Sequence, residues 1–210
     1  DASIRAILNE NLVPVTLGGD HHISNPLIVS LANFTQKPVN VVHFDAHNDL
    51  YENFEGNKYS HASPFARIFE AGPNVCSKLV QIGIRAATDH NRQQAEKYNV
   101  SMFEMRNMPK CGTEMAVLIE KSIENDGPIY ITFDLDALDP AYAPAVNHWE
   151  PGGMSFRYAL DVIHNLKRRI VGADVVEYNP DRDVHGMTAM IAAKLVREIS
   201  ANIIIQSKQS

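Results

Sequence analysis

The sequence is poor in cysteine, in long apolar runs and in positive charge, and each shortage excludes a class of protein. Cys76 and Cys111 are the only cysteines among 210 residues. Two are too few for a disulfide framework and indicate a reducing compartment, so we expect a cytoplasmic protein. No apolar run reaches the length of a membrane span. The net charge is −6, whereas a nucleic-acid-binding protein needs a basic face. We therefore expect neither a membrane nor a nucleic acid as a partner.

The chain also lacks an initiator methionine, a signal peptide, internal repeats and a recognisable linker. Residues 1–210 are 45% hydrophobic and 21% charged, which suits one globular core, so we expect a single domain. The first residues look like a helix that has already begun, and we expect this domain to lack its N-terminal segment. A transit peptide in that segment would make the location mitochondrial instead.

Short β-branched runs alternate with amphipathic segments along the chain. Strands are predicted at 12–18, 39–45, 79–84, 129–134 and 170–177, with a weaker one at 100–105. Helices are predicted near 24–34, 62–71, 89–98, 113–125, 155–167 and 187–204. Asp89 and Ser155 stand where N-caps belong. This alternation predicts an α/β fold with three layers, α/β/α, around a mostly parallel sheet.

Acidic and imidazole side chains gather where four predicted strands end. In an open α/β sheet, ligands bind beyond the carboxyl ends of the strands. "GGDHH" follows the first strand, "DAHND" the second, "DLDALD" ends the fourth and "EYNPDRD" the last. The strands themselves carry almost no such residues. We therefore predict a functional site at this edge, and the Pro- and Gly-rich loop 138–153 is long enough to take part in it.

The residue types at this edge favour a metal centre. Asp45, His47 and Asp49 alternate along an extended segment, so their side chains point the same way. The set is too anionic for one zinc and lacks the thiolates of a structural zinc site, whereas mixed oxygen and imidazole ligands suit Mn²⁺. With bridging carboxylates, six residues can hold two ions. We predict two Mn²⁺ per chain, with six candidate ligands: His21, Asp45, His47, Asp49, Asp134 and Asp136.

Taken singly, each motif has a more ordinary interpretation. The pair Asp134 and Asp136 also fits phosphatases of the haloacid dehalogenase type, or a solvated turn. His21 alone fits a cap of the following helix. His22 should point away from His21, and His43, inside a strand, should be a core histidine with satisfied nitrogens. It is the coincidence of three motifs at strand ends that favours a metal site.

"GGDHHIS", "FDAHNDL" and "FDLDALDP" resemble the three signature motifs of the ureohydrolase family, which includes arginases and agmatinases. The resemblance extends from Leu17 to Glu198, and "FEGNKYSHASPFARI" and "EPGGMSFRYALDVIHNL" are most similar to plant-type arginases. It implies an arginase-like fold and a homotrimer or homohexamer. It also implies attack of a metal-bridging hydroxide on a guanidinium carbon, which releases urea and an amine.

The resemblance also implies a role for each site residue. Asp49 would orient the hydroxide, His61 would carry a proton to the leaving amine, and Glu177 would pair with the guanidinium group of the substrate. One Mn²⁺ would be held by His21, Asp45, Asp49 and Asp134. The other would be held by His47 and Asp136, with Asp45 and Asp134 as bridges.

The far end of the substrate is less well determined. Tyr51 stands where animal arginases carry an Asn that binds the amino-acid part of arginine, and Ala62 follows His61 where they carry Gly. We expect Asn57 and loop 138–153 to supply the missing contacts. The favoured reaction is hydrolysis of L-arginine to ornithine and urea. One alternative substrate is agmatine, which would be cleaved to putrescine and urea. A guanidino acid other than arginine is the second alternative.

Two other interpretations remain open. Metal deacetylases share the arginase-like fold but use one zinc and lack the full set of paired motifs. A non-catalytic paralogue that partners an active subunit should have lost ligands, and this chain retains all six with His61 and Glu177.

Overall fold

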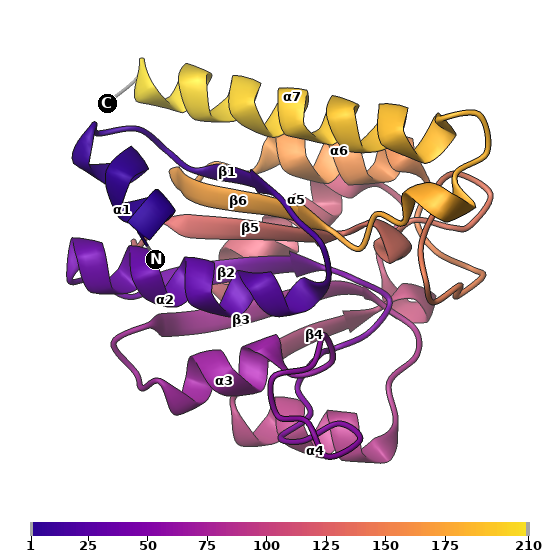
Figure 1. Ribbon diagram of the computed structural model, residues 1–210, viewed down its shortest axis with the longest axis horizontal. Helices are drawn as coiled ribbons and strands as arrows, with labels where there is room; N and C mark the ends of the chain where they lie inside the picture. The colour runs from indigo at the N-terminus through magenta and orange to yellow at the C-terminus, as the bar shows by residue number, and fades with distance from the viewer. Residues whose placement is uncertain (1, 209–210) are drawn as a thin grey trace.

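Six strands form one sheet in the order β1-β6-β5-β2-β3-β4, and every neighbouring pair is parallel (Figure 1). The computed structural model describes residues 2–208. The strands are β1 (Val15–Leu17), β2 (Val39–Phe44), β3 (Cys76–Ile84), β4 (Ser101–Glu104), β5 (Ile129–Asp134) and β6 (Ile170–Val176). The helices are α1 (Ala2–Asn9), α2 (Ser24–Thr35), α3 (Pro64–Glu70), α4 (Asp89–Lys97), α5 (Gly112–Ser122), α6 (Phe156–Asn165) and α7 (Met187–Ser207).

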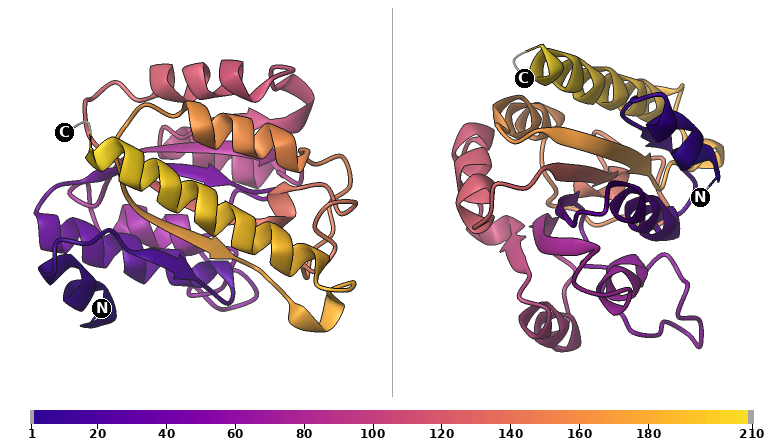
Figure 2. Two further views of the ribbon diagram at one scale, coloured as in Figure 1. Left: turned by 90° about the horizontal axis from the view of Figure 1, so that it is seen from above. Right: turned by 90° about the vertical axis from the view of Figure 1, so that its left-hand side faces the viewer.

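The two faces of the sheet pack into separate cores. Val41 of β2 packs against α2 and α3, whereas its neighbours Val42 and Phe44 belong to the core formed with α5, α6 and α7. Figure 2 shows these helices on the two sides of the sheet. Every residue of β2 and β5 is buried because both faces are covered. The predicted three-layer α/β/α fold with a parallel sheet is therefore confirmed.

The predicted elements are all present, although several of their ends differ. The paired part of β1 is shorter than predicted, and β3 begins three residues earlier. Ser155 caps α6 as predicted. The prediction of Asp89 as a cap was wrong: Thr88 caps α4 by accepting from the N–H of Asn91, while the Asn91 side chain accepts from the N–H of Thr88. This reciprocal pair satisfies two backbone donors, which Asp89 alone does not.

The order of the strands sets where the functional residues meet. β1, β6, β5 and β2 are consecutive in the sheet, so their carboxyl ends lie at one edge. These strands precede His21, Glu177, Asp136 and Asp45, respectively, although up to 156 residues separate them along the chain. Among residues 2–208, no helix is long and apolar enough to cross a bilayer.

Candidate metal centre

Three carboxylates converge on one nitrogen of His21. Its Nδ1 lies 3.0 Å from Asp45 Oδ2, 3.1 Å from Asp49 Oδ2 and 3.2 Å from Asp134 Oδ2. His21 lies on the short 3₁₀ turn that joins β1 to α2, and all four residues are buried. Such a cluster is costly in a dry site unless a cation offsets the negative charge.

The hydrogen bonds behind His21 determine which nitrogen faces the carboxylates. The Thr132 hydroxyl donates to Asp174 Oδ1 at 2.6 Å, so its oxygen is left to accept from His21 Nε2, 2.9 Å away. Nε2 therefore carries the hydrogen of the neutral ring, and Nδ1 presents a lone pair to the carboxylates. Nδ1 has no hydrogen-bond partner although it is buried. The donor set fits a divalent cation, because the Nδ1 lone pair of His21 and the three carboxylate oxygens around it could all be ligands of one ion.

A second group lies beside the first and shares Asp45 with it. His47 Nδ1 is 3.0 Å from Asp136 Oδ2 and 3.4 Å from Asp45 Oδ1. Asp45 thus directs one oxygen toward His21 and the other toward His47. Backbone donors hold these carboxylates in place, since the N–H of His47 donates to Asp45 Oδ1 and that of Ala46 to Asp136 Oδ1. Two adjacent positions with a shared carboxylate can accommodate two ions.

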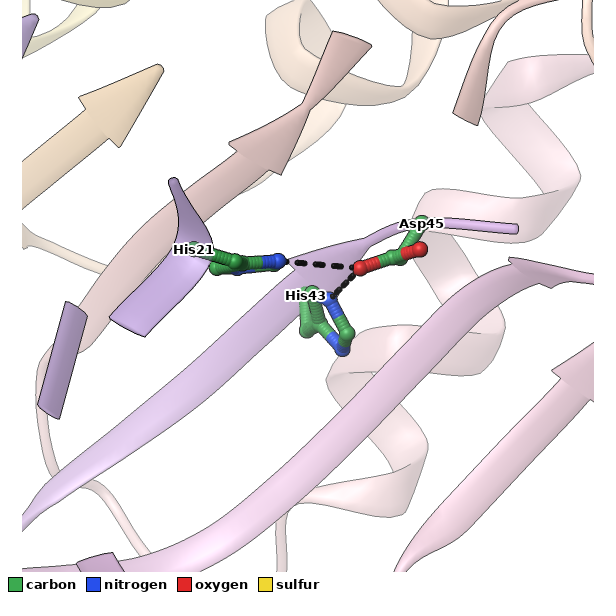
Figure 3. Close-up of side chains that lie close together, drawn as sticks. All are labelled: His21, His43 and Asp45. Atoms are coloured by element: carbon green, nitrogen blue, oxygen red, sulfur yellow. Dashed lines mark hydrogen bonds and ion pairs between the residues drawn. The ribbon is translucent and has the colours of Figure 1, made fainter. Parts of the chain in front are cut away.

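His43 contacts the same aspartate but is not placed as a ligand. Gln81 Nε2 donates to His43 Nδ1 at 3.0 Å, so His43 Nε2 carries the hydrogen and donates to Asp45 Oδ2 at 2.7 Å. Figure 3 shows His21 and His43 directed at the same oxygen of Asp45. Burial lowers the pKa of His43, which favours its neutral form. The prediction of a satisfied core histidine is confirmed, and the ring orients Asp45 from behind.

A pocket of about 160 Å³ opens beside the two groups. Glu177 forms part of its wall: the residue is 9% exposed, and its Oε1 accepts from the backbone N–H of His21 at 2.7 Å. Asp49 and Glu177 have positive φ angles of 49° and 65°, which are uncommon for residues other than glycine and often mark functional positions. The lining residues are His47, Asn48, Asp49, Tyr51, Phe54, His61, Ala62, Ala86, Asn91, Asp134, Asp136, His148 and Glu177.

Asn57 is the one predicted site residue that belongs neither to the pocket lining nor to the two histidine–carboxylate groups beside it. It lies in an exposed turn, where its Oδ1 accepts from the N–H of Tyr59 at 2.9 Å. The side chain therefore stabilises its own turn. His22 also lies outside the pocket lining, as predicted, and its ring meets that of Tyr59 edge-on.

His148 is a pocket residue that the sequence motifs did not reveal. Its ring stacks on His61 with centroids 5.3 Å apart, and it meets His47 edge-on at 6.0 Å. It belongs to loop 138–153, for which only length and composition indicated a function. Asn91 was missed as well, because it lies on α4, outside every motif.

Burial and mutual repulsion make Asp134 and Asp136 hard to ionise without a cation. Burial, with the charges of Asp136 and Asp45, raises the pKa of Asp134 well above its usual range. Burial and Asp45 also raise the pKa of Asp136 to about 7. Burial opposes the charge on His47, but its bonds to Asp136 and Asp45 raise its pKa to about 12. Burial likewise opposes the charge on His21, yet Asp134, Asp45 and Asp49 raise its pKa well above the usual value.

Together, the fold and this geometry define a three-layer α/β protein with a candidate carboxylate–histidine metal centre at the carboxyl ends of a parallel sheet. The model of the "Arginase family" matches residues 1–201, and the chain belongs to that family. Arginase 1, mitochondrial, of Arabidopsis thaliana is 49% identical over 203 residues, which cover 96% of this chain and 58% of that protein.

Agmatinase, mitochondrial, of Gallus gallus is 37% identical over 201 residues, which cover 94% of this chain and 58% of the agmatinase. Among solved structures, arginase from Medicago truncatula superposes with a TM-score of 0.86 at 44% identity, covering 96% of this chain and 63% of that one. The chain thus spans somewhat less than two thirds of each of these relatives.

Metal binding should be linked to pH. The metal-free protein holds a proton on Asp136 below about pH 7 and on His47 below about pH 12, whereas a cation binds the ionised carboxylate and the neutral ring. Binding therefore releases protons, and affinity for Mn²⁺ should rise with pH through about 7, roughly tenfold per pH unit for each proton released. Calorimetric titration with Mn²⁺ at about pH 6 and about pH 8 measures this. Asp136→Asn should remove the share of this rise that comes from the Asp136 proton and so lower the slope, and pH-independent affinity in the unaltered protein would contradict the prediction.

Proposed function

We propose that the complete protein is a binuclear manganese hydrolase that cleaves the guanidinium group of a small substrate to urea and an amine. The observation that carries this proposal is the pair of histidine–carboxylate groups that share Asp45 beside Glu177 in one pocket. Two bound Mn²⁺ ions would acidify a water molecule there and so supply a nucleophile near neutral pH. Asp45 would be a bridging ligand, and family membership supports Asp134 as the other.

Three pocket residues would act on the substrate. Glu177 would pair with the planar guanidinium group, for which a carboxylate is the natural partner, and its bond from His21 N–H fixes its orientation. Asp49 would accept a hydrogen bond from the attacking water and so align it with the guanidinium carbon. As the C–N bond breaks, His61 would donate a proton to the leaving nitrogen, because imidazole side chains are common general acids and bases in enzymes.

L-Arginine is the favoured substrate, with ornithine as the amine released. The identity to a plant arginase is higher than to the agmatinase, which supports this choice. One observation favours agmatine as the second candidate: no lysine or arginine is among the described residues that line the pocket, so no cation would pair with the carboxylate of arginine. Retention of all six ligands argues against an inactive paralogue, and two adjacent metal positions argue against a one-zinc deacetylase.

Urea release from a substrate panel tests the proposal. The full-length protein, loaded with Mn²⁺, should release urea from arginine with a higher kcat/KM than from agmatine, guanidinobutyrate or guanidine. Chelation should abolish activity and Mn²⁺ should restore it. If kcat/KM is higher for agmatine than for arginine, agmatine and not arginine is the substrate. No urea from any of the four compounds would refute the proposed reaction.

His61→Ala tests the proton donor. Removing the imidazole should lower kcat by roughly 10²–10⁴-fold, the range for general acid–base groups, without loss of bound Mn²⁺. His164→Ala is the matched control, because His164 pairs with Glu198 on α7, away from the pocket. A fully metallated His61→Ala protein with unchanged kcat would show that His61 has only a structural role.

We further propose that the protein forms a homotrimer or homohexamer. Support comes from apolar side chains exposed on α7, including Met190, which is 71% exposed, and Ile204 and Ile205, each 54% exposed. Covering such side chains is favourable, and contiguous apolar patches often mark interfaces. Light scattering of the full-length protein should give the mass of three or six chains. A monomer at every concentration would exclude this assembly.

A further inference from the structure

Arg85 follows β3, and its side chain is held by backbone carbonyl groups. Nε and Nη2 donate to the carbonyl of Glu150 at 2.7 and 2.5 Å, and Nη2 also donates to that of Asp136 at 2.7 Å. Nη1 donates to the carbonyl of Gly83 at 3.1 Å. Longer bonds, of 3.4 and 3.3 Å, reach the carbonyls of Ala137 and Leu138. A guanidinium group has five N–H donors in a rigid fork, so it can join several segments at once.

The bonded carbonyls belong to three segments that converge on the metal centre. Gly83 lies at the end of β3. Asp136 is a candidate ligand in the turn after β5, and Glu150 belongs to loop 138–153, which also carries His148. The backbone N–H of Arg85 donates to the carbonyl of Ala46, the residue after Asp45. Arg85 therefore connects β3 with the segments that follow β2 and β5 and with the loop over the pocket.

The loop approaches the guanidinium closely enough to require a glycine. A Cβ at Gly153 would lie 2.7 Å from Arg85 Nη2 and 2.5 Å from the backbone nitrogen of Asp139. Contacts this short exclude a side chain at position 153 unless the backbone moves. Gly153 thus lets the loop pack closely against both the Arg85 guanidinium and the backbone of Asp139.

The hydrogen bonds of Arg85 reach a candidate ligand of one metal position, Asp136, and none that belongs only to the other position. Asp136 is fixed at both ends, because its carbonyl accepts from Arg85 and its Oδ1 accepts from the N–H of Ala46. Its Oδ2 faces His47 Nδ1 at 3.0 Å. None of the carbonyls bonded to Arg85 belongs to His21, Asp49 or Asp134, which form the other group.

We propose that Arg85 is a positioning residue for the metal position formed by His47 and Asp136, and that it acts through the backbone of Asp136 and of loop 138–153. The inference rests on the proposed two-metal function. It predicts that loss of the guanidinium weakens one of the two metal positions and leaves the other intact. Partners behind a ligand typically contribute 10–100-fold to metal affinity.

The direction in which metal affinity changes distinguishes a positioning role of Arg85 from a purely electrostatic one. Arg85 is cationic, so replacing it with a neutral residue removes a repulsion toward a bound metal ion and should strengthen binding if charge alone mattered. Loss of positioning should weaken binding. Arg85→Met keeps much of the side-chain volume without the donors. Arg85→Lys keeps the charge but offers one ammonium group, which cannot span the three segments.

Arg168 provides a matched control. Its guanidinium also donates to backbone carbonyls, those of Ile123, Asn125 and Gly127, near the opposite ends of the strands. Arg168→Met therefore removes a comparable set of bonds far from the metal centre, together with an ion pair between Arg168 Nε and Glu120 Oε2 at 3.0 Å. Its effect on thermal unfolding without metal gives the cost of losing such a set of bonds.

The test is equilibrium dialysis of each full-length variant against a series of Mn²⁺ concentrations, with bound manganese measured by elemental analysis. Arg85→Met should weaken one of the two manganese positions by about 10–100-fold, Arg85→Lys should weaken the same position, and Arg168→Met should leave both unchanged. The proposal is overturned if Arg85→Met binds both ions as tightly as, or more tightly than, the unaltered protein. It is also overturned if both positions weaken equally.

Enzyme activity distinguishes this inference from the function on which it rests. If the unaltered protein binds two Mn²⁺ but releases no urea, the proposed reaction fails, whereas the titrations still decide the role of Arg85. If the unaltered protein is active and Arg85→Met titrates like Arg168→Met, only the inference about Arg85 fails.

Discussion

Repulsion among buried carboxylates is the constraint on which the rest of this structure depends. Asp45, Asp49, Asp134 and Asp136 are each at most 6% exposed, and they meet around two imidazole nitrogens. Removing such charges from water is unfavourable unless a cation offsets them. Burial, together with this repulsion, raises the pKa values of Asp134 and Asp136. A fold that maintains this cluster holds the candidate ligand atoms close together.

The parallel sheet provides the framework for that cluster. Four consecutive strands end at one edge, and each continues into a short turn or loop that contributes polar side chains. The central strands β2 and β5 are buried on both faces, so they can carry apolar residues almost throughout. The candidate metal ligands lie at or beyond the strand ends, where the pocket opens, whereas Asp174 is buried within β6.

Groups behind the ligands use three different chemical means to orient them. Thr132 and Asp174 hold His21 through a chain of hydrogen bonds, which leaves Nδ1 directed at the carboxylates. His43 holds Asp45 with a neutral imidazole. Arg85 acts on the backbone and touches none of the ligand side chains. Ligand geometry thus depends on residues that no metal-binding motif contains, which is common for metal centres.

The sequence by itself determined the alternation of strands and helices and the six candidate ligands, because these patterns are local. Strand side chains alternate, buried strands are apolar, and polar residues at a strand end stand out against them. The order of the strands was decided only by the tertiary structure, since it depends on contacts such as that between His21 and Glu177, 156 residues apart. The path of loop 138–153, which brings His148 to His61, and the turn that directs Asn57 away from the pocket were also decided there. The strand order and the path of the loop depend on residues far apart in the sequence, which no short stretch contains, whereas Asn57 bonds within its own turn, to the N–H of Tyr59, a local choice that only the structure showed.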